Sequence, residues 1–168
     1  ERADYLRSLD TVATVRRMGP ADQERVAQLT QKTNQFNLTT RRYSLEDVAA
    51  FAQAEGCAVF VVSVKDRFGD LGTVGVLIVR KEQTSAIVDT LLLSCRALSR
   101  NIEYAFVDQA MTLVERDWQI NTWLADYIPS RKNAQTAEFW DALGFQLESE
   151  GRQGKHYRAP TRGRPQDY

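Results

Sequence analysis

VDTLLLSCRALSRN, residues 88–101, joins the end of an apolar strand to the beginning of an amphipathic helix. We predict the strand over residues 85–94, which are rich in Ile, Val and Leu. We predict the helix over residues 101–117, because apolar side chains recur there at helical spacing. Residues 119–127 have the pattern of another strand. A strand–helix–strand unit of this kind implies one parallel pair of strands in the sheet.

Upstream of this unit, the sequence predicts an antiparallel hairpin preceded by two helices. Apolar runs at residues 57–65 and 73–80 flank a turn cluster at 66–72, which is typical of a hairpin. Ser44 and Asp47 form a capping box at the start of the second helix. The segments expected before the hairpin are a strand at 11–18, a helix that begins at Ala21 or Asp22, a polar loop at 32–43 and a helix at 45–55.

Downstream, the sequence predicts a helix and a terminal hairpin. Pro129 interrupts the chain, residues 133–143 form a short helix closed by Gly144, and residues 145–150 pair with 156–159. The expected order is strand, two helices, three strands, helix, strand, helix and two strands. This is a mixed α/β (α+β) pattern, in which helices flank a mostly antiparallel sheet.

The composition describes one folded domain without a strong charge. The chain has 168 residues, 43% of them hydrophobic, and 22 basic residues balance 22 acidic ones. This balance argues against disorder and against an indiscriminate binder of nucleic acid or anionic membranes. The sequence shows neither a membrane-length apolar run nor a secretory signal, so we expect a cytoplasmic protein. We expect residues 1–10 to be a linker remnant, 11–159 the domain and 160–168 a flexible tail.

Two local motifs match an acyltransferase pattern. The first is RALSRN at residues 96–101, and the second is Asn133-Ala134 followed by FWDALGF at 139–145. With the order of elements, they resemble the GNAT acyltransferase fold from residue 11 to about 159. The resemblance implies that backbone N–H groups at a helix N-terminus bind the phosphates of coenzyme A or of a phosphopantetheine arm. The implied cofactor-binding residues are Arg96, Ser99, Arg100, Asn101 and Asn133.

The first motif departs from the GNAT pattern at two positions. Ser99 and Asn101 stand where glycines are expected. Asn tolerates a positive φ better than most residues, so phosphate binding stays compatible with the motif. The alternative is an ordinary capped helix start, because Ser and Asn both cap helices well.

Three longer blocks carry a second resemblance. They are QLTQKTNQFNLTTRRY (28–43), FGDLGTVGV (68–76) and VDTLLLSCRALSR (88–100), and they resemble the C-terminal region of FkbH-like proteins. Those proteins join a HAD-type phosphatase domain to a GNAT-like domain, and this chain resembles only the GNAT-like half. The resemblance implies transfer of a glyceryl-type acyl group from an acyl phosphate to the phosphopantetheine thiol of an acyl carrier protein in polyketide biosynthesis. The implied partners are that carrier protein and a HAD-type phosphatase domain, with no nucleic acid and no membrane.

Cys95 is the predicted catalytic residue. It follows the strand at 85–94 and precedes Arg96, at the place where the GNAT fold separates two strands and holds an acyl thioester in the gap. The thiolate is the nucleophile, and a cation beside a helix N-terminus favours it. The alternative is a buried small side chain. Cys57 opens a buried strand and is assigned no role. We expect no disulfide, and the two cysteines and His156 are too dispersed for a metal cluster.

The polar loop at 32–43 is the predicted substrate-binding segment. Its amides and hydroxyls suit a hydroxylated acyl group, and its arginines suit phosphate or carboxylate. The alternative is that these side chains satisfy the backbone of the loop itself. The predicted substrate-binding residues are Asn34, Gln35, Asn37, Thr39, Thr40 and Arg41.

The remaining polar groups are assigned weaker roles. His156, the one histidine, has no evident carboxylate partner and is expected on the surface of a strand. Trp140 replaces the tyrosine that many GNAT enzymes use as an acid, so Tyr127 or Tyr157 would have to stand in for it. Asp89 is expected at a strand edge.

Three functions therefore remain open at this stage. The first is an acyltransferase domain that handles an acyl thioester. The second is a catalytically degenerate module that docks a carrier protein or a HAD-type domain. The third, acetylation of an amine by acetyl-coenzyme A, ranks lowest because the sequence shows no evident general base.

Overall fold

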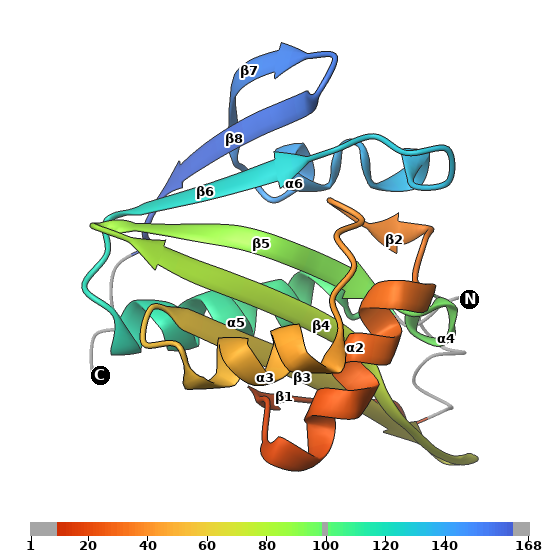
Figure 1. Cartoon of the computed structure of the whole chain (residues 1–168). Coiled ribbons are helices and arrows are strands. Elements are labelled where there is room, and N and C mark those ends of the chain that lie inside the picture. The colour runs from red at the N-terminus through yellow and green to blue at the C-terminus, as the bar shows by residue number, and fades with distance from the viewer. Residues whose placement is uncertain (1–9, 99–100, 163–168) are drawn as a thin grey trace.

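The computed structural model describes residues 10–98 and 101–162 (Figure 1). The strands are β1 (Val12–Arg17), β2 (Phe36–Asn37), β3 (Cys57–Asp66), β4 (Gly69–Glu82), β5 (Ser85–Leu93), β6 (Thr122–Tyr127), β7 (Gln146–Gly151) and β8 (Gly154–Pro160). The helices are η1 (Pro20–Asp22), α2 (Gln23–Lys32), α3 (Leu45–Gln53), α4 (Cys95–Leu98), α5 (Glu103–Asp117), η2 (Ala134–Thr136) and α6 (Phe139–Ala142).

The described strands form one mixed sheet in the order β1-β3-β4-β5-β6-β8-β7, and β2 pairs with β5 outside this path. All neighbours are antiparallel except β5 and β6, which confirms the predicted parallel pair. Helices α2 and α3 cover one face of the sheet and α5 covers the other (Figure 1). No helix in the described ranges is long and apolar enough to cross a membrane.

Both faces of the central strands are buried. On β3, Phe60 and Val62 belong to the large apolar cluster that includes α5, whereas Val59 and Val61 belong to the cluster beneath α2 and α3. Alternate side chains of a strand point to opposite faces, so a strand covered on both sides reads as a continuous apolar run. This is why residues 57–65 are recognisable in the sequence as a buried strand.

The predicted order of elements is confirmed, with four local differences. Residues 36–37 form a strand inside the predicted loop, and four residues from Cys95 form the separate helix α4. The predicted helix at 133–143 is two shorter pieces, η2 and α6. The hairpin turn is much shorter than the cluster at 66–72, because β4 begins at Gly69. Short elements of two to four residues carry too few positions to show a period.

The two ends of the chain lie mostly outside the described residues, including nearly all of the predicted linker and most of the predicted tail. The described part of that tail is attached to the domain. The backbone N–H of Arg162 donates to a carboxylate oxygen of Glu115 at 2.9 Å, and its guanidinium also contacts Asp108.

The sheet opens between β5 and β6. Their parallel pairing runs from Ser85 opposite Thr122 to Val88 opposite Ala125 and stops there. At the same point β5 bulges against β4, because Val79 lies opposite Val88 but the preceding residue lies opposite Thr90. The extra residue of the bulge is Asp89. Beyond it, the edge of β5 turned toward β6 is free for another partner.

Candidate functional site

The gap between β5 and β6 is filled by residues 36–38, which we call the resident segment. Phe36 and Asn37 pair with the last residues of β5 as strand β2. The N–H of Leu38 donates to the carbonyl of Leu91 at 3.1 Å, and the carbonyl of Leu38 accepts from the N–H of Ile128 at 2.8 Å. The resident segment therefore bridges the two strands that have separated, and its three side chains are buried.

Two predicted binding asparagines hold this arrangement together. The amide of Asn133 donates to the carbonyls of Asn37 and Ile128, each at 2.9 Å. Its oxygen accepts from the Tyr127 hydroxyl and from the N–H of Ser130. The Asn37 amide is likewise used inside its own loop, and both asparagines are fully buried. Their polar groups are therefore already occupied by the protein, as a structural role requires.

An open groove lies at the end of β5, next to the resident segment. Its volume is about 620 Å³. Among its lining residues, four are cations and none is acidic, and within the described ranges no carboxylate pairs with any of the four. We call it the Cys95 groove. Its polar lining includes Arg25, Lys32, Thr33, Asn34, Gln35, Ser94, Cys95, Arg96 and Lys132.

Cys95 is an exposed free thiol on the wall of this groove, so the alternative of a buried small side chain is wrong. Its sulfur lies 4.0 Å from the Oε1 atom of Gln35. The neighbouring Ser94 hydroxyl is buried, and no described residue forms a hydrogen bond with it. Cys57 is buried and free, and burial, followed by the negative charge of Asp89, raises the pKa of its thiol. Both cysteines are free in the structure.

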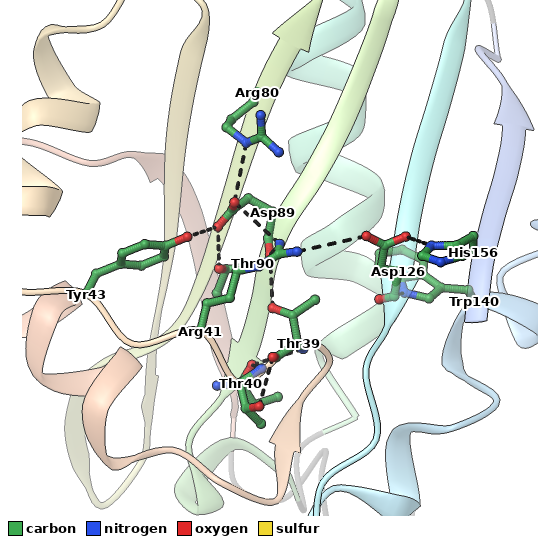
Figure 2. A network of polar contacts seen from close by, with 11 residues as sticks. Thr39, Thr40, Arg41, Tyr43, Arg80, Asp89, Thr90, Asp126, Trp140 and His156 are labelled. Atoms are coloured by element: carbon green, nitrogen blue, oxygen red, sulfur yellow. Dashed lines mark hydrogen bonds and ion pairs between the residues drawn. The ribbon is translucent and has the colours of Figure 1, made fainter. Parts of the chain in front are cut away.

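A second polar site surrounds Asp89 at the bulge (Figure 2). The Asp89 carboxylate accepts a 2.6 Å hydrogen bond from the Tyr43 hydroxyl and a 3.3 Å hydrogen bond from Nε of Arg80. Thr90 donates to the same carboxylate at 2.8 Å. Burial, followed by the hydrogen bond from the Tyr43 hydroxyl to Asp89, raises the pKa of the Tyr43 phenol. Asp89 is only 5% exposed and lies in the middle of β5, at its bulge, and not at a strand edge as expected.

Arg41 links this site to the pair formed by Asp126 and His156, across the opening of the sheet (Figure 2). Its guanidinium donates to the backbone carbonyl of Asp89 at 2.6 Å and lies 4.0 Å from the carboxylate of Asp126. Asp126 in turn lies 2.6 Å from Nδ1 of His156. The expectation that His156 has no carboxylate partner is therefore wrong. The two residues face each other in the β6–β8 register and are 30 positions apart in the chain, so local sequence carried no signal of the pair.

The other predicted loop residues serve mainly the protein itself. The Thr39 hydroxyl donates to the Asp89 carbonyl at 2.9 Å, and the Thr40 hydroxyl donates to the Thr39 carbonyl at 2.8 Å. The Asn34 oxygen accepts from Arg42. These contacts are those of the alternative, in which the loop satisfies its own backbone and that of β5. Only Gln35 and Asn34 of this predicted set line the Cys95 groove.

Trp140 and the two tyrosines considered as acids in its place are also engaged in hydrogen bonds. Trp140 donates from Nε1 to the carbonyl of Asp126 at 3.1 Å. The hydroxyl of Tyr127 donates to Asn133, and that of Tyr157 donates to Asp141 at 2.7 Å. Burial raises the pKa of both phenols. Neither tyrosine presents a free hydroxyl to the Cys95 groove.

The expected phosphate-binding turn is described only in part. Ser99 and Arg100 lie outside the described residues. Asn101 has a φ of 57°, the left-handed conformation that glycine would adopt most easily. Glu103 lies in the first turn of α5, and its buried Oε2 atom has no hydrogen-bond partner among the described residues. A carboxylate in this position opposes a phosphate at the same helix end.

Comparison of the structure with known proteins identifies the fold. The ribosomal-protein-S18-alanine N-acetyltransferase of Escherichia coli is 12% identical, with a TM-score of 0.67 over 94% of this chain and 99% of that chain. A GNAT-family acetyltransferase of Staphylococcus aureus is 9% identical, with a TM-score of 0.69 over 90% and 100%. The spermidine N-acetyltransferase of Vibrio cholerae, in complex with CoA and spermine, is 13% identical, with a TM-score of 0.67 over 89% and 95%.

The chain therefore has the GNAT acetyltransferase fold, as the sequence predicted, and identities this low define the fold alone. No protein-family model and no curated protein sequence matches the chain.

The fold implies coenzyme A or a phosphopantetheine arm in the gap between β5 and β6. The residues present do not fit an arm in that gap, because the resident segment already occupies it. In this structure residues 36–38 lie where the sequence resemblance led us to expect an acyl thioester. The Cys95 groove remains open and cationic, and its residues suit the phosphates of an anionic ligand.

Proposed function

We propose that this domain transfers an acyl group through Cys95, with a glyceryl-type acyl phosphate or thioester as donor and the phosphopantetheine thiol of an acyl carrier protein as acceptor. The observation that carries the proposal is the Cys95 groove, where one exposed thiol shares a cavity with four cations that form no ion pair with any carboxylate of the described residues. The GNAT fold and the sequence resemblance to FkbH-like proteins support acyl transfer as the reaction class.

The chemistry at Cys95 needs two balanced displacements. In the first, the Cys95 thiolate attacks the acyl carbon, a carbon–sulfur bond forms, and the donor's phosphate or thiolate leaves with the bonding electrons. In the second, the carrier thiolate attacks the new thioester and the Cys95 thiolate leaves. Both steps occur at one groove, because donor and acceptor are bound in turn.

The charges of the groove suit the reactants. An acyl phosphate and a phosphopantetheine arm both carry phosphate, and Arg96 and Arg25 can bind a phosphate in bidentate fashion. Lys32 and Lys132 are exposed at the same groove and act as point charges.

A docking module is the second candidate, and the filled gap favours it. The resident segment occupies the gap between β5 and β6 in which the fold implies that an acyl thioester binds. In this case the four cations of the groove would bind an acidic carrier protein or a HAD-type phosphatase domain, and Cys95 would take no acyl group.

Intact-mass measurement separates the two candidates. We would incubate the full chain with acetyl phosphate and, separately, with a glyceryl thioester. Acyl transfer predicts one added acyl group that is lost in Cys95→Ala and retained in Cys57→Ala. If neither donor adds mass while the carrier protein still binds, the acyltransferase proposal is refuted and docking is supported.

Charge variants test the groove itself. Lys132→Glu and Arg96→Glu should both slow acylation and weaken carrier binding, because each places a negative charge at the groove. Arg152→Glu provides the matched control, since Arg152 is exposed on the β7–β8 turn and does not line the groove. Equal effects of all three variants would mean that the groove has no special part in binding.

A further inference from the structure

We infer that residues 36–38 are a permanent strand of this domain, which keeps a pantetheine arm out of the gap between β5 and β6. The inference goes beyond the proposed function, because it concerns the gap between β5 and β6, where the fold implies a pantetheine arm, and not the Cys95 groove. It is carried by the hydrogen bonds, the burial and the packing of the resident segment.

The hydrogen-bonding groups that an arm would need are already used. The carbonyl of Leu91 accepts from Leu38, and the backbone N–H of Ile128 donates to the Leu38 carbonyl. Asn133 adds a third link from the opposite side of the gap, to the carbonyl of Asn37. An arm entering here would have to break all three, and buried donors and acceptors without partners are strongly unfavourable.

The side chains of the resident segment belong to the main core. Leu38 is 1% exposed and Phe36 is 8% exposed, and both are members of the large apolar cluster beneath α5. The Phe36 ring meets the Phe139 ring edge to face, with their centroids 5.6 Å apart. Moving the segment aside would expose two large apolar side chains to water.

The inner end of the gap is closed as well. The bulge frees the backbone carbonyl of Asp89, but this carbonyl accepts from the Thr39 hydroxyl and from the Arg41 guanidinium. Thr39 follows the resident segment directly in the chain, and Arg41 lies two residues further on. The same loop therefore occupies the whole gap beside β5, from the last residue of that strand to the bulge at Asp89.

The consequence concerns where an arm can meet this domain. Phosphate groups can be held in the Cys95 groove, outside the sheet, while the acyl end stays out of the gap. The bulge at Asp89 lies six positions before Cys95 in the chain, and neither Asp89 nor Thr90 lines the Cys95 groove. A reaction at the Cys95 groove and a reaction at the Asp89 bulge would therefore occur at different places. The resident segment keeps a pantetheine thioester from reaching the bulge and leaves the groove open to it.

Amide hydrogen exchange of the ¹⁵N-labelled full chain tests the inference, with coenzyme A itself as the probe. We expect the amides of Leu38 and Ile128 to exchange at least about 1,000-fold more slowly than an unstructured amide, because they open only with the core. Millimolar coenzyme A should leave both rates unchanged. The Phe68 amide is held only by a local hydrogen bond to the Asp66 side chain at the exposed hairpin tip, so it should exchange far faster than Leu38 and serves as the control.

Faster exchange of Leu38 or Ile128 on addition of coenzyme A would overturn the inference, since it would show that the arm displaces the segment. Rapid exchange of Leu38 without ligand would overturn it too. Asn133→Ala removes one link and should speed exchange at Leu38 by on the order of 10-fold. Asn121→Ala, at an exposed asparagine outside the gap, should leave it unchanged.

The result is distinguishable from that of the proposed function. Acylation of Cys95 does not require the gap, so a protected Leu38 with no acyl adduct would refute only the proposed function. A displaced Leu38 together with an adduct on Cys95 would refute only the present inference.

Discussion

Replacement of Leu38 by alanine tests whether the resident segment is part of the core or a loop laid over a binding site. Leu38 is 1% exposed, and alanine keeps the N–H and carbonyl that bridge β5 and Ile128. The substitution removes three carbon groups, each worth about 0.8 kcal/mol on burial, or about 2.4 kcal/mol together. The cavity left behind raises the expected loss of unfolding free energy to about 3–4 kcal/mol.

Guanidinium denaturation, followed by tryptophan fluorescence, measures this loss. Trp123 and Trp140 are both buried, so their emission reports global unfolding. Leu147→Ala is the matched control, because Leu147 is 43% exposed and its truncation should change stability by less than about 0.5 kcal/mol. A loss below about 1 kcal/mol for Leu38→Ala would refute the reasoning, because a displaceable loop loses little when it is truncated.

Three further outcomes follow from the contacts. Iodoacetamide should alkylate exposed Cys95 well before Cys57, whose thiol is buried with a raised pKa, and mass mapping will give the order. His156, as the one histidine, should show the Nδ1–H tautomer by ¹⁵N NMR, since the Asp126 carboxylate only accepts, and Asp126→Ala should remove that preference. The Tyr43 phenol has a pKa raised above its unfolded value of about 10, so stability should fall as pH rises beyond that value. Tyr43→Phe should flatten this alkaline loss in denaturation experiments, and an unchanged slope would contradict the assigned hydrogen bond.

The sequence predicted the sheet well because its strands are long and covered on both faces. The apolar runs at 57–65 and 85–94 are unambiguous signals of buried strands, and the helix at 103–117 has a clear apolar stripe. The parallel pair followed from the order of these elements. The resident segment escaped prediction because a strand of two residues has no period, and its partner on β5 is more than fifty positions away.

The candidate site was predictable only where its chemistry is local. Cys95 and Arg96 are neighbours in the chain, and both line the groove. The contact between Asp126 and His156 depends on the register of β6 against β8, and the burial of Asp89 depends on a bulge. Neither feature can be read from neighbouring residues, because both arise from pairing between distant strands. The loop side chains assigned to substrate mostly bind the protein's own backbone, as Thr39 does at Asp89.

Single-turnover transfer tests the central claim most directly. The full chain would first be loaded with a labelled glyceryl group from a thioester or acyl phosphate, freed of donor, and then mixed with phosphopantetheinylated acyl carrier protein. The account predicts that the label leaves Cys95 and appears on the carrier thiol, and that Cys95→Ala carries no label at all. Label that never loads on Cys95, or that loads there and is released only by hydrolysis, would contradict acyl transfer by this domain.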